Sequence, residues 1–169
     1  MGIDASADGD TVFVAAGVYY EEIHINNKSI SLIGDNNMNT IITTPILTIY
    51  SEEEKTVSYS NFKIYGNEVQ GRMMYLGCSE CINEEKINII FNNIEFNGND
   101  NRSAIALNYN YNVTINNSIF KDLEAGGDDG GALHLSSMGH GSNFYRFLEI
   151  NNTIFDNCNS VLIYASKIG

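Results

Sequence analysis

The sequence predicts an all-β fold, a three-faced parallel β-helix, and three observations predict it. The 169 residues include 24 Asn and 22 Ile, together more than a quarter of the chain. Apolar and polar residues alternate in many short stretches, which is the pattern of half-buried strands. One phrase centred on Asn recurs along the chain, and repeats of this length indicate a solenoid.

The repeated phrase aligns on a shared Asn at four places, which are Asn61, Asn93, Asn117 and Asn152. The steps between them are 32, 24 and 35 residues, so the shortest step is the bare repeat and the others carry insertions. On both sides of the Asn, alternate residues are large and apolar, which predicts a strand before it and a strand after it. We expect the Asn to form the bend, because Asn tolerates left-handed backbone.

A third apolar stretch closes each unit, at residues 72–76, 104–107, 131–135 and 160–163. Three such short strands cannot bury their own apolar faces, so we expect the units to stack, with each strand parallel to its copies. Stacking places Phe96, Phe120 and Phe155 on one axis and joins the Asn side chains in a ladder. With the alternating residues upstream, we expect about six rungs. The alternative is a β-sandwich of antiparallel strands with coincidental Asn-rich turns.

Residues 9–34 resemble the first-rung signature of the pectin-lyase-like superfamily, with Ala16 where that signature usually has Pro. The Asn-Asn-x-x-Phe repeats and Gly130-Gly131-Ala132-Leu133 resemble adhesin-like surface proteins of methanogenic archaea. The resemblance implies a right-handed parallel β-helix over nearly the whole chain. It implies less about activity, because the superfamily hosts lyases, hydrolases, phage spikes and non-catalytic adhesins.

We expect residues 1–169 to be one domain, the N-terminal portion of a longer protein, with residues 1–9 the remnant of an N-terminal cap. The net charge of −12 argues against nucleic-acid partners, because little basic charge is present to neutralise phosphates. No apolar run is long enough to insert into a membrane. The oligomeric state stays open.

Catalysis is not expected within this chain. The resemblance to pectate lyases and polygalacturonases implies carboxylates that converge on the outward face of the first strands. That face carries Ser58, Ile90, Thr114 and Glu149. One carboxylate in four rungs cannot make a two-carboxylate site, so no catalytic residue is predicted.

Two insertions supply the candidate ligand-binding residues, because loops on a rigid scaffold often carry function. Asp100 and Arg102 lie in one insertion and Asp128 and Asp129 lie in the next, and stacking brings the two loops together. No resident cofactor is predicted, and the three Asp residues are the candidate ligands if Ca²⁺ binds. The alternative is a solvated acidic turn.

His134 completes this candidate site, and strand alternation predicts that its side chain faces solvent. Tyr75 and Tyr109 are candidates for stacking on sugar rings. The alternatives are an ordinary surface histidine and tyrosines that serve as good strand formers. Among the cysteines, Cys158 falls in an apolar column and is expected to be a small buried side chain.

We therefore expect a non-catalytic, extracellular or cell-surface module that binds polysaccharide or another cell-surface glycan. One alternative is a polysaccharide lyase or glycoside hydrolase whose carboxylates come from the two insertions or from rungs beyond Gly169. Another is a receptor-binding spike of the phage type.

Overall fold

The computed structural model of the chain describes residues 2–43, 47–51, 53–66, 71–76, 87–99, 102–108, 111–124, 131–137, 147–158 and 163–167. These residues form one short helix, α1 (Gly2–Ala5), and a series of strands. Every pairing between described strands is parallel. The all-β prediction is confirmed for this part of the chain, and the antiparallel sandwich is wrong for it.

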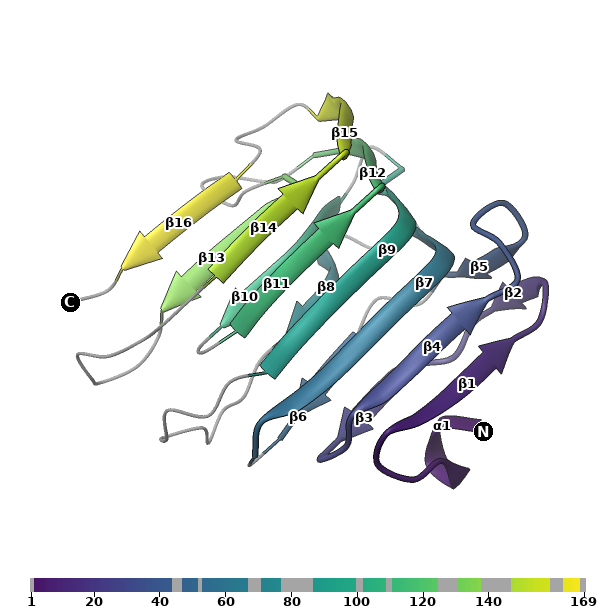
Figure 1. Cartoon of the computed structure of the whole chain (residues 1–169). Helices are drawn as coiled ribbons and strands as arrows, with labels where there is room; N and C mark the ends of the chain where they lie inside the picture. The colour runs from purple at the N-terminus through teal and green to yellow at the C-terminus, as the bar shows by residue number, and fades with distance from the viewer. Residues whose placement is uncertain are drawn as a thin grey trace.

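The strands fall into three parallel stacks (Figure 1). The first stack contains β1 (Asp10–Val14), β4 (Ile30–Gly34), the first halves of β7 (Lys55–Tyr65) and β9 (Ile87–Asn97), β11 (Tyr111–Asn116) and β14 (Phe147–Asn151). The second contains β2 (Gly17–Tyr19), β5 (Thr40–Ile42), the second halves of β7 and β9, β12 (Ile119–Leu123) and β15 (Ile154–Cys158). The third contains β3 (Ile23–Asn26), β6 (Leu47–Tyr50), β8 (Gly71–Leu76), β10 (Arg102–Asn108), β13 (Leu133–Ser137) and β16 (Ile163–Lys167), with β6 lying beside β8.

The strand register matches the repeat read from the sequence. Ser60 pairs with Asn92 and Phe62 pairs with Ile94, so Asn61 and Asn93 lie at the same position of neighbouring strands. The same alignment continues from β9 to β11 and from β11 to β14. The steps of 32, 24 and 35 residues are therefore the offsets between paired strands.

The shared Asn forms a bend inside a continuous ladder of strands. Its φ angle is 63° at Asn61, 55° at Asn93, 51° at Asn117 and 48° at Asn152, all in the left-handed region. Asn adopts this region more readily than other residues with a Cβ, which explains why Asn recurs here. One left-handed residue turns the chain from the first stack to the second without ending β7 or β9.

Aromatic rings fill the space between the stacks. Phe120 stacks on Phe96 with ring centroids 4.7 Å apart and on Phe155 with centroids 5.1 Å apart. Tyr59 stacks on Phe91 at 5.5 Å. The predicted alignment of the three phenylalanines is confirmed, and full burial of a ring such as Phe96 or Phe120 contributes roughly 1.5–3 kcal/mol.

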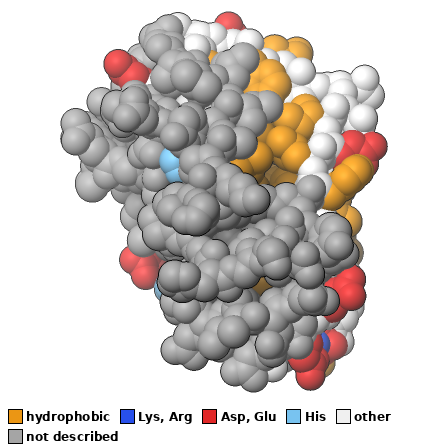
Figure 2. All heavy atoms as spheres, turned by 90° about the vertical axis from the view of Figure 1, so that its left-hand side faces the viewer, with side chains coloured by type: hydrophobic (Ala, Val, Ile, Leu, Met, Phe, Trp, Pro, Cys, Tyr) orange, Lys and Arg blue, Asp and Glu red, His pale blue; other side chains and the backbone are white. Residues whose placement is uncertain are grey.

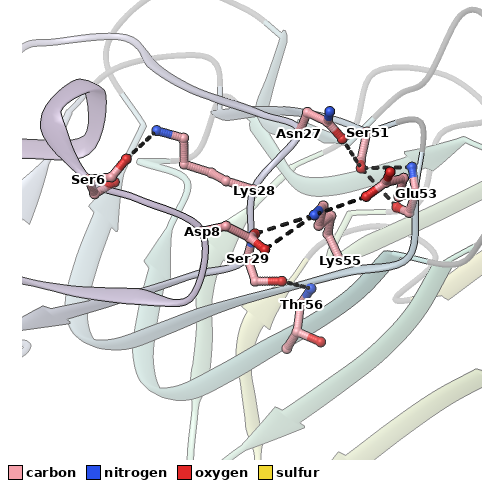
Figure 3. A network of polar contacts seen from close by, with 9 residues as sticks. All are labelled: Ser6, Asp8, Asn27, Lys28, Ser29, Ser51, Glu53, Lys55 and Thr56. Atoms are coloured by element: carbon pink, nitrogen blue, oxygen red, sulfur yellow. Dashed lines mark hydrogen bonds and ion pairs between the residues drawn. The ribbon is translucent and has the colours of Figure 1, made fainter.

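The N-terminal segment is fastened to the strands by a polar network (Figure 3). Nζ of Lys28 donates to the carbonyl oxygens of Ile3 and Ser6 at 3.0 and 2.9 Å. Oδ1 of Asp8 accepts a hydrogen bond from the Ser29 amide at 2.6 Å, and Lys55 lies 3.4 Å away. Ile3 packs against the apolar core. The only helix among the described residues is these four residues of α1, far short of a membrane span.

Candidate functional site

Most of the predicted site residues lie outside the described residues. Asp100, Tyr109, Asp128 and Asp129 are among them, so the loop cluster and its Ca²⁺ site stay predictions. Arg102 and Tyr75 are placed only by their backbones, in β10 and β8. Within the described residues, no group of three or more His, Cys, Asp or Glu is arranged to hold a metal ion.

His134 is buried, so the prediction that it faces solvent is wrong. Its exposed fraction is 9%. Alternation predicts which face of β13 the side chain occupies but not whether that face is covered. Ala104, Ile105, Ala106 and Leu107 on neighbouring β10 are all buried, which shows that both faces of this stack are covered here.

The side chains on the outer face of the first stack form three rows, at every second strand position, and most of them are polar. The first row holds Thr56, Asn88, Asn112 and Phe147, the second holds Thr11, Ser31, Ser58, Ile90, Thr114 and Glu149, and the third holds Phe13, Ile33, Ser60, Asn92, Asn116 and Asn151. The residues between them point into the core and are buried or half-buried. The outer face is therefore mostly polar. Within each row, equivalent side chains follow one another at the spacing of the strands.

Two of the rows contain ladders of side-chain amides. In the first row, Nδ2 of Asn112 donates to Oδ1 of Asn88 at 2.9 Å, and Nδ2 of Asn88 donates to Oε1 of Glu54 at 3.2 Å. In the third row, Asn151 donates to Asn116 at 3.0 Å and Asn116 donates to Asn92 at 2.9 Å. All the amides point the same way, so each ladder has a donor end and an acceptor end.

A second type of bend, not predicted from the sequence, also carries paired polar side chains. Asp122 and Asn157 have φ angles of 51° and 49°, and Nδ2 of Asn157 donates to Oδ1 of Asp122 at 2.8 Å. Each lies five residues after a shared Asn, Asn117 or Asn152. That common offset is the signal by which these residues are recognisable.

The first-row ladder borders an open groove of about 360 Å³. Its walls are Thr56, Asn88, Ile89, Ile90, Asn112, Thr114 and Phe147. Phe147 is 56% exposed and occupies the register position where the next ladder amide would lie. This groove was not predicted from the sequence, although Thr56, Asn88, Asn112 and Phe147 all lie five residues before a shared Asn.

The described residues that line the groove are uncharged, and acidic residues lie at its margins. The carboxylates of Glu54 and Glu149 are exposed beside it, and none of the described lining residues is Lys or Arg. Lys55 is directed elsewhere, to Asp8 and Glu53. These ion pairs raise the pKa of Lys55 despite the opposing effect of desolvation.

Apolar surface is present at both ends of the stacks. At the β14–β15 end, Phe147 and Ile154 are exposed and orange side chains are visible in Figure 2. At the β1 end, a hollow of about 320 Å³ is lined mainly by apolar residues, including Ile3, Val12, Leu32 and Phe62. Among the described residues that line this hollow, Glu21 is the acidic one.

Cys158 lies in the predicted apolar column, in register with Leu123. It is half-buried, and this burial raises the pKa of its thiol. Its Sγ atom lies 3.5 Å from the carbonyl oxygen of Asp156. A protonated thiol is a poorer nucleophile than a thiolate, so the raised pKa disfavours a nucleophilic role for Cys158.

Comparison of the chain with family models, curated proteins and solved structures gives no match.

Proposed function

We propose that the three stacks are the faces of a right-handed parallel β-helix of six rungs, of the pectin-lyase-like kind. The order of the strands supports this proposal. β1, β2 and β3 follow one another along the chain, and β4, β5 and β6 pair with them in the same order. Parallel connections of this kind are right-handed in nearly all proteins, which supports the handedness.

We further propose that the chain is a non-catalytic module that binds polysaccharide outside the cell. The observation that carries this proposal is the groove on the first stack, where an exposed aromatic ring lies beside a ladder of amides. Sugar rings present hydroxyl groups at their edges and C–H groups on their faces. Amides and aromatic rings together satisfy both kinds of surface.

The scaffold also suits a binding role. Amide groups of Asn92 and Asn116 are held by their neighbours, and the strands beneath them are packed on a buried core. A preorganised surface loses little conformational entropy when it binds a ligand. Such a face therefore supports binding without a closing lid.

Binding to immobilised polysaccharides tests this function. The proposal predicts that the protein is retained by at least one polymer and releases neither reducing ends nor unsaturated sugars from it. Failure to bind any polymer of a broad panel contradicts the binding role. Release of soluble products contradicts the non-catalytic role and favours a lyase or hydrolase.

A further inference from the structure

We propose that the groove bordered by Asn88, Asn112 and Phe147 selects uncharged glycan chains, built of hexose or N-acetylhexosamine units, over acidic ones. This inference rests on the proposed polysaccharide-binding function and names the ligand class and the place where it binds. It follows from the open end of the amide ladder, from the exposed ring beside that end, and from the charges at the margin.

The ladder ends in an open acceptor. Asn112 donates to Asn88, and no donor from the described part of the chain reaches Oδ1 of Asn112. On the next strand, the register position that would supply another amide holds Phe147. A hydroxyl or N-acetyl N–H of a sugar can donate to this oxygen and so continue the ladder.

The exposed ring lies beside that acceptor. Phe147 pairs in register with Asn112, and 56% of its surface is in contact with solvent. A sugar whose edge is bonded to Asn112 can lay its C–H face on this ring, which removes apolar surface of both partners from water. Half-buried Ile90 extends the apolar part of the groove.

The ladder repeats at the spacing of the strands, about 4.8 Å. This spacing is close to the length of one sugar unit in an extended chain, so successive units meet equivalent side chains. Thr56, Asn88 and Asn112 then offer hydroxyl and amide groups to neighbouring units, in line along the stack. The groove is consequently suited to an extended chain more than to a single sugar.

Charge decides between neutral and acidic glycans. Glu54 and Glu149 flank the groove, and the described residues that line it include no cation. A uronate in the groove is repelled by both carboxylates and gains no ion pair from this described lining. Neutral chains avoid this repulsion, so they are the favoured ligands.

Calorimetric titration of the whole chain with four hexasaccharides tests the inference. The probes are cellohexaose, mannohexaose, N-acetylchitohexaose and hexagalacturonate. At least one uncharged probe is expected to bind at least about tenfold more tightly than hexagalacturonate. Preferred binding of hexagalacturonate overturns the ligand class but leaves the polysaccharide-binding function standing, whereas failure of every probe and every polymer overturns both.

Matched variants locate the site. Phe147→Ala is expected to weaken binding of the best uncharged probe by about tenfold, because an aromatic anchor is removed. Phe13→Ala is the control, because Phe13 is also exposed and lies on β1 at the other end of the same sheet. It is expected to leave affinity unchanged within about twofold. Loss of binding in Phe13→Ala alone, or in neither variant, overturns the proposed place.

Three further variants test the amide ladder and the charge at the margin of the groove. Asn112→Ala is expected to weaken binding of the uncharged probe. Asn151→Ala, which shortens the third-row ladder, is expected to have no effect on this affinity. Glu149→Gln is expected to tighten hexagalacturonate binding and to leave the uncharged probe unchanged. Equal effects of Asn112→Ala and Asn151→Ala, or no response of hexagalacturonate to Glu149→Gln, contradict the inference.

Discussion

The side chain of Asn93 donates a hydrogen bond to Oδ1 of Asn61 at 2.8 Å, although 32 residues separate the two in sequence. Both residues have a left-handed backbone, with φ angles of 55° and 63°. Asn therefore forms the bend within each repeat and also the side-chain hydrogen bond between one repeat and the next. An Asn at this position stabilises the fold in two independent ways, which substitutions separate.

Asn93→Ala is expected to lower the free energy of unfolding by about 1–2 kcal/mol, because Ala is strained in the left-handed region and forms no side-chain hydrogen bond. Asn93→Gly keeps the left-handed conformation and loses only the side-chain hydrogen bonds, donated to Asn61 and accepted from Asn37, so its effect is expected to be smaller. Urea unfolding measures both. Asn92→Ala is the control, since Asn92 takes part in a ladder without a left-handed φ. Equal losses for Ala and Gly at residue 93 contradict the role of the backbone.

Phe120 has ring neighbours on both sides, whereas Phe155 has one and is half-buried. Phe120→Ala is expected to destabilise the fold by about 3–5 kcal/mol, because it leaves a cavity between two rings. Phe120→Leu, which fills most of that space, is expected to cost about 1.5 kcal/mol or less. Phe155→Ala is expected to fall between these two. Urea midpoints that rank Phe155→Ala as the most harmful of the three contradict the stacked arrangement.

Gly34 lies against the backbone of the next layer. A Cβ atom added to it would overlap the carbonyl oxygen of Asn61 and lie 3.1 Å from Thr40. Because a backbone atom cannot rotate away, Gly34→Ala is expected to destabilise the fold by about 2 kcal/mol or more. Gly17→Ala is the control, since its Cβ would meet only the Tyr19 ring at 3.5 Å. Thermal unfolding that shows the same stability for both variants contradicts this close approach.

The carboxyl group of Asp8 makes the stability of the fold depend on pH. The amide of Ser29 and then Lys55 lower the pKa of its carboxyl below the ordinary 3.8. The unfolded carboxyl therefore binds a proton at higher pH than the folded one. Its contribution to stability is present above pH 3.8 and is lost as pH falls through the folded pKa.

Urea unfolding of wild type and Asp8→Asn at neutral and acidic pH measures this contribution. The stability difference between them is expected to shrink as the pH is lowered through about 4 to below 3. Asp156→Asn, on the exposed surface of β15, is a control of equal charge change. A difference that stays constant, or grows in acid, contradicts the role of Asp8.

Much of the stacking was predictable because one residue type marks the same place in every layer. The bend and the register are both set by the shared Asn, at Asn61, Asn93, Asn117 and Asn152. A phenylalanine follows each of the last three of these residues at the third position and marks the core. These properties depend on local conformation and on the period of the repeat. They can therefore be read without coordinates.

The groove and the burial of His134 were not predictable in the same way. The groove depends on which side chain each insertion brings into register, and the step of 35 residues puts Phe147 where an amide would continue the ladder. The burial of His134 depends on what covers the third stack. Alternation within one strand contains no information about either.

The distance between Ser31 and Glu149 tests the stacked arrangement most directly. Both lie in the second outer row, separated by four strand spacings and more than a hundred residues of sequence. Spin labels at Ser31→Cys and Glu149→Cys, in a variant whose three native cysteines are serine, report this distance by electron paramagnetic resonance. Stacking predicts a narrow distribution near about 19–20 Å, allowing for the length of the labels. A broad distribution, or one centred beyond about 35 Å, contradicts it.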